Sequence, residues 1–157
     1  MEITFRYAKR EDAELLLTFT HKIGVYEKAD DKVSATKERI EKWMFDKQYG
    51  EALFIMVDGK EVGSCVFHEG FADYLGKGFL FIDQLYLDEE YRGSGLGKAV
   101  LKKMAEITIE RDCERLEWLC LDWNPAYRFY EYMGAKPQTD LTIFRVTGQE
   151  LYEMLKK

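Results

Sequence analysis

The chain is poor in several residue types and patterns, and each shortage excludes a class of protein. Its 157 residues include two prolines, Pro125 and Pro137, and no internal repeat, low-complexity tract or Gly/Ser/Pro-rich linker. We therefore expect one domain spanning residues 1–157. No apolar run approaches the ~18 residues that span a bilayer, and no signal-peptide pattern opens the chain. These absences predict a soluble, cytoplasmic protein without a membrane partner.

Cysteine, histidine and positive charge are also scarce. The three cysteines, Cys65, Cys113 and Cys120, are odd in number and form no C-x-x-C pair, which favours core residues in a reducing compartment. The two histidines, His21 and His68, have no metal-ligand spacing, so we expect no metal site. Lys and Arg number 23 against 29 Asp and Glu, a net charge of −6. This balance argues against a nucleic-acid partner and suits a cationic small molecule.

Hydrophobic periodicity predicts strands and helices in alternation along the chain. We expect an Asp58-Gly59 hairpin turn, a loop from Phe71 to Gly78, and a helix start near Ser34. Asn124-Pro125 opens one helix and Gly134 closes it. The predicted strands are 2–7, 52–57, 62–68, 79–87, 116–121 and 141–146, and the predicted helices are 11–27, 34–47, 95–111, 125–134 and 149–155. This order predicts an α/β (α+β) fold with a mixed sheet.

A glycine-containing loop, residues 91–98, lies between a predicted buried strand and an amphipathic helix. Its sequence is Y-R-G-S-G-L-G-K. Backbone amides at glycines approach an anion closely, and the helix N-terminus adds about half a positive charge, so the loop suits a pyrophosphate. A dinucleotide fingerprint fails because Lys98 stands where its third glycine belongs, and a P-loop fails because Ala99 follows Lys98. A plain glycine-rich turn is the remaining structural interpretation.

The loop resembles a known family. Arg92, Gly95 and Gly97 give the pattern R-x-x-G-x-G, which is similar to the acyl-CoA pyrophosphate loop of GNAT acetyltransferases. Further along, the segments Asp122-Trp123-Asn124-Pro125, Phe129-Tyr130 and Gly134-Ala135 resemble the spermidine/spermine (diamine) and thialysine N-acetyltransferase branch. With the order of elements, the resemblance covers nearly the whole chain. It implies the GNAT fold, with splayed central strands, and acetyl-CoA as acetyl donor to a small primary amine.

The resemblance also implies which residues hold acetyl-CoA. The backbone next to the splayed strands would pair with the pantetheine arm, the glycine loop would hold the pyrophosphate, and the later helix would line the cofactor. In that order the residues are Leu85, Tyr86 and Leu87; Arg92, Gly93, Ser94, Gly95, Leu96, Gly97 and Lys98; and Asn124, Tyr127 and Tyr130.

Acetyl transfer to an amine needs a base for the ammonium and an acid for the departing thiolate. By resemblance Tyr130 is the general acid, and the competing interpretation is a core tyrosine. Asp83 directly follows the apolar residues 79–82, where a lone carboxylate is costly and marks either a function or an ion pair with a core Arg or Lys. We expect it to bind the substrate ammonium and draw off its proton through water. His68 fits a strand-end histidine in solvent better.

Two departures leave the acceptor open. The branch carries Glu-Asp where this chain has Asp83-Gln84, and Tyr74 replaces a tryptophan of the substrate loop. A polyamine, a diamine, a thialysine-like amino acid or another primary amine fits, and so does a protein amine. The alternative class is a non-catalytic acyl-CoA-binding module. The residues Leu141 to Leu155 resemble the dimer-forming end of the branch, which predicts a homodimer.

Overall fold

The computed structural model describes all 157 residues. Its backbone packing separates into two compact units, residues 1–119 and 120–157, which are described one after the other. No helix is both long enough and apolar enough to cross a bilayer.

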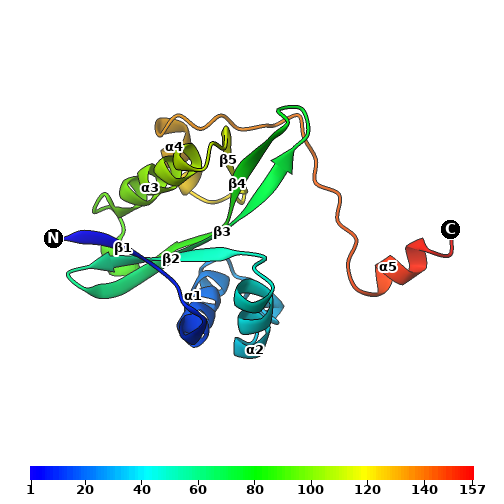
Figure 1. Ribbon diagram of the computed structural model, residues 1–157, viewed down its shortest axis with the longest axis horizontal. Coiled ribbons are helices and arrows are strands. Elements are labelled where there is room, and N and C mark those ends of the chain that lie inside the picture. Colours follow the sequence, from blue (N-terminus) through cyan, green and yellow to red (C-terminus); the bar gives the residue numbers. More distant parts are fainter. The chain divides into compact units, whose positions relative to one another are not determined.

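The first unit is built on a mixed five-stranded sheet in the order β1-β2-β3-β4-β5 (Figure 1). Neighbouring strands are antiparallel from β1 to β4, and β5 runs parallel to β4. The predicted mixed sheet is therefore confirmed. The strands are β1 Ile3–Tyr7, β2 Glu51–Val57, β3 Lys60–Ala72, β4 Lys77–Leu87 and β5 Arg115–Trp118.

The two hairpins of the sheet differ in how well the sequence predicted them. Asp58 and Gly59 have φ of +49° and +82° and form the predicted turn between β2 and β3. The predicted loop from Phe71 to Gly78 is wrong, because β3 and β4 continue to pair as far as Ala72 and Lys77. A Cβ on Gly70 would lie 2.5 Å from the Phe79 ring. Glycine at this position therefore makes room for an aromatic neighbour within the hairpin.

Three helices cover the sheet, namely α1 Ala13–Tyr26, α2 Lys37–Ile40 and α3 Leu96–Glu110. Figure 1 shows α1 and α2 on one side of the sheet and α3 on the other. The predicted start of the second helix at Ser34 is two residues early, since the Thr36 hydroxyl accepts a hydrogen bond from the Arg39 amide (3.2 Å). That helix continues as a π-helical segment, Glu41–Asp46.

The core lies on both faces of the sheet. Leu16 and Phe19 of α1 pack against Ala52, Phe54 and Met56 of β2. On the opposite side, α3 buries a periodic stripe of Leu96, Val100, Leu101, Met104, Ile107 and Thr108. Burying a large apolar side chain contributes about 1.5–3 kcal/mol. These two layers hold β4 and the start of α3, the elements that carry the predicted site, in fixed positions.

A β-bulge interrupts the pairing of β3 with β4. Val66 lies opposite Gln84 and Phe67 lies opposite Ile82, so Asp83 is the extra residue. Cross-strand partners share a face and neighbours on one strand face opposite ways. Ile82 and Gln84 therefore lie on opposite faces of the sheet although they are two residues apart.

The second unit contains α4 Ala126–Tyr132 and α5 Gln149–Met154. The Asn124 side-chain oxygen accepts a hydrogen bond from the Ala126 amide (3.0 Å), and Gly134, with φ of +94°, ends the helix, as predicted. The predicted strand 141–146 does not form, because the segment pairs with no other strand, and a strand requires a hydrogen-bonding neighbour. The predicted strand 116–121 ends at Trp118, in the first unit, where its pairing with β4 stops.

Candidate active site

The glycine loop leads from β4 to the N-terminus of α3. Gly93 and Gly95 have φ of +74° and +89°, and a Cβ on either would meet nothing within 4 Å. Glycine is thus required here for backbone conformation, and the loop surface is open. Gly95 precedes α3 without a side-chain cap, and the first turn of α3 has no acidic residue. The first amides of this 15-residue helix are therefore left to a ligand or solvent.

Two side chains fix the start of this loop. Arg92 donates from Nε to the Leu87 carbonyl (3.1 Å), and its guanidinium lies 4.5 Å from the centre of the Tyr26 ring and 5.6 Å from that of Tyr86. Ser94 donates from Oγ to the Tyr91 carbonyl (2.5 Å). Arg92 belongs to the loop that we predicted to hold the pyrophosphate, and its Nε is bonded to the end of β4.

The second half of β4 has an open edge. Its pairing with β5 covers only Phe79 to Ile82. On the other edge, the Asp88 amide donates to the Val62 carbonyl of β3 (2.8 Å). Because backbone groups alternate in direction along a strand, the N–H and C=O groups of Leu85 and Leu87 face away from β3. They lie along the edge that β5 leaves unpaired.

The bulge brings Asp83 and His68 together at the point where this open edge of β4 begins. The Asp83 carboxylate lies 2.6 Å from Nδ1 of His68, and the His68 ring packs beside Phe81, with ring centres 5.4 Å apart. We predicted a buried carboxylate at Asp83, but its side chain is 43% exposed because the bulge turns it out of the sheet. Its partner is a histidine rather than a core Arg or Lys. The interpretation of His68 as a strand-end histidine in solvent is also wrong, because His68 lies within β3 and bonds to Asp83.

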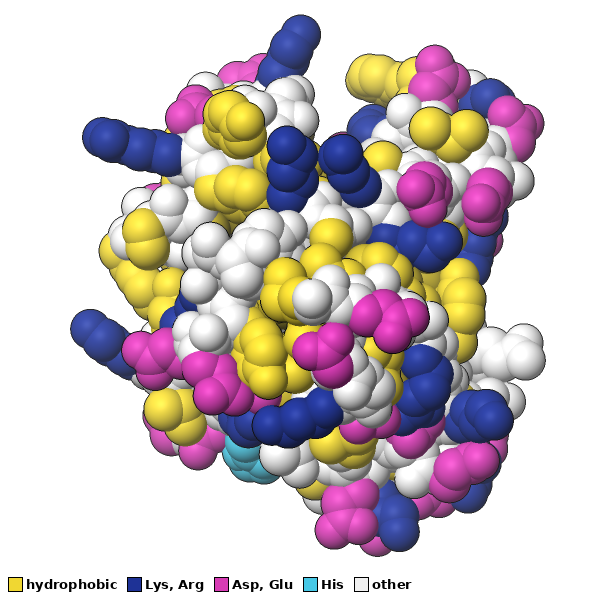
Figure 2. Space-filling view, turned by 90° about the vertical axis from the view of Figure 1, so that its left-hand side faces the viewer, with side chains coloured by type: hydrophobic (Ala, Val, Ile, Leu, Met, Phe, Trp, Pro, Cys, Tyr) yellow, Lys and Arg dark blue, Asp and Glu magenta, His cyan; other side chains and the backbone are white.

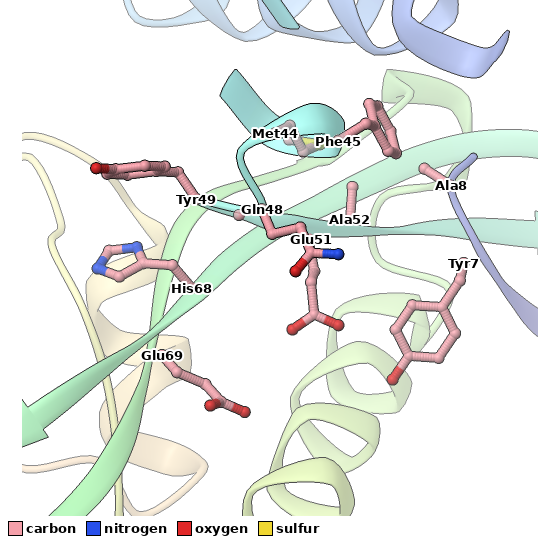
Figure 3. A pocket seen from close by; sticks show the side chains of 11 residues that line it. Tyr7, Ala8, Met44, Phe45, Gln48, Tyr49, Glu51, Ala52, His68 and Glu69 are labelled. Atoms are coloured by element: carbon pink, nitrogen blue, oxygen red, sulfur yellow. The ribbon is translucent and has the colours of Figure 1, made fainter. Parts of the chain in front are cut away.

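A cavity of about 490 Å³ opens beside His68 (Figure 3). Its lining comes from the end of β1, the start of β2, two residues within β3 and the segment that precedes β2. The polar and aromatic lining residues are Tyr7, Gln48, Tyr49, Glu51, His68 and Glu69. Carboxylates and aromatic rings in one cavity are groups that hold an organic cation.

An ion-pair cluster holds the two carboxylates of this cavity. Arg111, which follows α3, lies with Nη1 2.6 Å from Glu51 and 2.6 Å from Glu69, and it packs over the Phe67 ring. The hydrogen bonds that Arg111 donates to Glu51 and then to Glu69 raise the pKa of its guanidinium above the usual range. One fixed cation thus faces two anions, so the cluster carries a net negative charge.

Three predicted site residues, Asn124, Tyr127 and Tyr130, belong to the second unit. Tyr127 and Tyr130 lie on α4 and are half-buried, and the Asn124 side chain caps that helix. The Tyr130 ring packs beside Phe129, with ring centres 5.7 Å apart. The remaining predicted residues lie on β4, in the glycine loop and in the first turn of α3.

Sequence reasoning missed Tyr49, Glu51, Glu69 and Arg111 as parts of one site. They lie far apart in the chain, and no motif links them. Glu69 follows His68 directly, which is the one local signal that could have placed it near the candidate site.

The comparisons with known proteins agree with this geometry. Residues 13–135 match the acetyltransferase (GNAT) family, and the chain belongs to that family. A thialysine N-epsilon-acetyltransferase of Bos taurus is 27% identical, over 99% of this chain and 98% of the relative. An L-ornithine N5-acetyltransferase of Arabidopsis thaliana is 33% identical over 57% of this chain and 40% of the relative. An integron cassette protein from the mobile metagenome of V. cholerae has a similar fold, with a TM-score of 0.82 at 21% identity over 100% of this chain and 99% of that chain.

Proposed function

We propose that the protein transfers the acetyl group of acetyl-CoA to a primary amine of a small cationic acceptor. The observation that carries this proposal is the conjunction of an uncapped α3 N-terminus with the open edge of β4 at Leu85 and Leu87. A thioester cofactor needs an anion site for its pyrophosphate and backbone partners for its amide-containing arm. The chain supplies both within a few residues of each other.

In this proposal the α3 end and the glycine loop hold the pyrophosphate, with Lys98 in the first turn supplying a cation. Leu85 pairs its backbone groups, and Leu87 its amide, with the pantetheine arm, because the Leu87 carbonyl already accepts a hydrogen bond from Arg92. Tyr86 lies between them. By the resemblance to the acetyltransferase branch, Asn124 and Tyr127 are further contacts of the cofactor. The cofactor supplies an activated acetyl group, and these residues bind and orient it.

The acceptor is a small amine cation. Two curated relatives are named for thialysine and ornithine, both of which carry a side-chain amine. Figure 2 shows acidic and basic side chains intermixed on one face of the molecule, while the cavity beside His68 is lined by two carboxylates. Local charge at the site, rather than a large charged surface, therefore favours an ammonium group. Asp83 adds a third carboxylate nearby.

Tyr130 is the proposed general acid. During transfer the amine nitrogen forms a bond to the carbonyl carbon, the carbon–sulfur bond breaks, and the electron pair stays on sulfur. A phenol that donates its proton to the thiolate lets coenzyme A leave as a thiol. Tyr130 lies on α4, the helix that Asn124 caps, and it matches the Phe-Tyr pair of the related branch.

A thiol-release assay with acetyl-CoA and four acceptors tests the proposed function. The acceptors are thialysine, L-ornithine, spermidine and a peptide with a free N-terminus. We expect release with at least one of the three small amines and none with the peptide. Binding of acetyl-CoA by calorimetry without release for any acceptor would establish a non-catalytic binding module, and release with the peptide alone would establish a protein acetyltransferase.

The predicted homodimer draws support from the second unit. Leu141, Ile143 and Phe144 are exposed in an extended segment without a partner strand, followed by an α5 whose Leu151 and Tyr152 are exposed. A second copy would cover these apolar side chains and pair the backbone. Light scattering of the full chain and of a chain ending at residue 139 tests this, with a dimer expected only for the full chain.

A further inference from the structure

We infer that His68, oriented by Asp83, is the group that removes the proton from the acceptor's ammonium. This inference rests on the proposed function and moves the proton-accepting role from Asp83, where the sequence placed it, to His68. It follows from the geometry of the pair, from its place on β4 and from the cavity that His68 lines.

The contact with Asp83 fixes which nitrogen of His68 is basic. An ionised carboxylate only accepts hydrogen bonds, so the Nδ1 that lies 2.6 Å from Asp83 carries the hydrogen. In the neutral ring Nε2 therefore holds the lone pair, and no protein group bonds to it. Packing against Phe81 holds the ring plane. His68 is a positioned base, and Asp83 is its positioning residue.

The pair also stands where the proton must be removed. Asp83 is the first β4 residue beyond the pairing with β5, and Leu85 follows two residues, or roughly 7 Å, along the strand. His68 lines the cavity beside Tyr49, while the side chains of Glu51 and Glu69 point away from its ring (Figure 3). An acceptor amine that reaches His68 therefore lies beside Asp83, the first residue of β4 that β5 leaves unpaired.

An imidazole is better suited to this step than a carboxylate. It accepts protons close to neutral pH, whereas a carboxylate is a much weaker base at that pH. The His68 side chain is 38% exposed, so it can return the proton to solvent.

His68 Nε2 takes one proton from R–NH3⁺, and the Asp83 carboxylate stabilises the imidazolium that forms. The free amine then bonds to the thioester carbonyl carbon and the thiolate leaves with the carbon–sulfur electron pair. The second nitrogen proton reaches the thiolate by way of Tyr130, so the products are the amide, the coenzyme A thiol and one proton released from His68.

The test compares two histidine–aspartate pairs in the same chain. His21 Nδ1 lies 2.7 Å from Asp30 on the surface of α1, so His21→Gln is the matched control for His68→Gln. We expect His68→Gln to lower kcat/KM for thialysine or ornithine by about a hundredfold or more at neutral pH. Asp83→Asn should lower it as well, and the double variant should lose little more than either single one. His21→Gln should keep wild-type kinetics.

The pH profile separates a base from a structural residue. Asp83 contacts His68, and the other ionisable groups at this end of the sheet are Tyr7, Tyr49, Glu51 and Glu69, which line the same cavity, and Arg111, which pairs with the two glutamates. The substitution His68→Gln leaves all of them in place. Its deficit should shrink as the pH rises, because solvent then deprotonates the amine, whereas a structural defect gives the same deficit at every pH.

Three results decide the inference. Activity of His68→Gln within about threefold of wild type overturns it, as does a deficit that does not change with pH. His68→Asn provides a second variant of the same base if His68→Gln does not fold by circular dichroism. A wild-type protein that acetylates none of the amines refutes the proposed function itself, whereas an active wild type with an unaffected His68→Gln refutes only the role of His68.

Discussion

The Nε of Arg92 donates a hydrogen bond to the carbonyl of Leu87, the last residue of β4, over 3.1 Å. The guanidinium also lies over the Tyr26 ring of α1. The glycine loop therefore begins from a fixed point, and its remaining path depends on the two glycines with positive φ. The proposed binding of a pyrophosphate at α3 would therefore depend on the path of the backbone rather than on a mobile side chain.

Gly95→Glu should abolish measurable acetyl-CoA binding, because it places a carboxylate at the uncapped end of α3. Gly59→Glu is the matched control, since Gly59 also has a positive φ, +82°, and open space around its Cβ position. Both variants bear the same backbone strain. Calorimetry should show binding for Gly59→Glu only, and equal affinity of the two variants would contradict the assignment of the loop.

Tyr130→Phe should lower kcat at saturating acetyl-CoA by about a hundredfold, the low end of the range for a lost general acid. A thiol is a fair leaving group unaided, so the deficit should shrink for acyl donors with more acidic thiols. Tyr132→Phe, on the same helix and 76% exposed, should change kcat little. A loss below about threefold in Tyr130→Phe would make it a structural residue.

Asp12 should contribute stability that is lost in acid. The hydrogen bond from Arg6, 2.7 Å long, lowers the pKa of the Asp12 carboxyl below its usual value. The folded state then binds fewer protons than the unfolded chain, so the stabilisation is complete above about pH 4 and is lost as the pH falls through the folded-state pKa. We expect about 1 kcal/mol. Urea unfolding at pH 6 and pH 2.5 should show a smaller acid loss for Asp12→Asn than for wild type.

Asp31→Asn is the control for this measurement, since the structure records no hydrogen bond or ion pair for the Asp31 side chain. It should lose as much stability in acid as the wild type. An equal loss of unfolding free energy in acid for all three proteins would show that Asp12 does not cause the pH dependence of stability.

Cys65 should be unreactive in the folded protein. Burial, and then the charge of Asp83, raise the pKa of its thiol to about 12, so the reactive thiolate is absent at neutral pH. Cys113 and Cys120 are partly exposed. In the double variant Cys113→Ser/Cys120→Ser, a thiol reagent should label Cys65 only as fast as the chain unfolds. Rapid labelling without denaturant would show that β3 is accessible.

Gly63→Ala should be strongly destabilising. Gly63 pairs with Leu87 at a closely spaced position of the β3–β4 ladder, and a Cβ there would collide with the Tyr86 carbonyl, which cannot retreat. Overpacking of this kind costs roughly 1–3 kcal/mol or more. Gly50→Ala meets only an ordinary contact, 3.5 Å from the Phe67 carbonyl, and should change the free energy of unfolding by less than about 0.5 kcal/mol.

The sequence predicted most elements because their signals are local. Asp58-Gly59 requires positive φ at two positions, and the stripe from Leu96 to Ile107 has helical spacing. The failed predictions concern segments whose structure depends on a neighbouring strand. The segment 141–146 alternates like a strand, but no second strand lies beside it, and the glycines near Phe79 look like loop residues until their cross-strand neighbours are known.

The candidate site was predictable only where its residues are consecutive in the sequence. The glycine loop is one continuous motif, so its place before α3 could be stated in advance. The pairing of His68 with Asp83 depends on the bulge, and the cluster of Glu51, Glu69 and Arg111 depends on three separate elements meeting at one end of the sheet. No periodicity in the sequence encodes either arrangement.

The bulge at Asp83 adds a carboxylate to β4 without changing the pairing of the rest of the strand. Ile82 and Gln84 lie on opposite faces on either side of it, and Gln84 bonds to Thr20 and Ser64. Deleting Asp83 would make Gln84 follow Ile82 directly, still opposite Val66, so the later residues of β4 would keep their partners and their faces. The shorter strand would keep its open edge and would lose the carboxylate that meets His68.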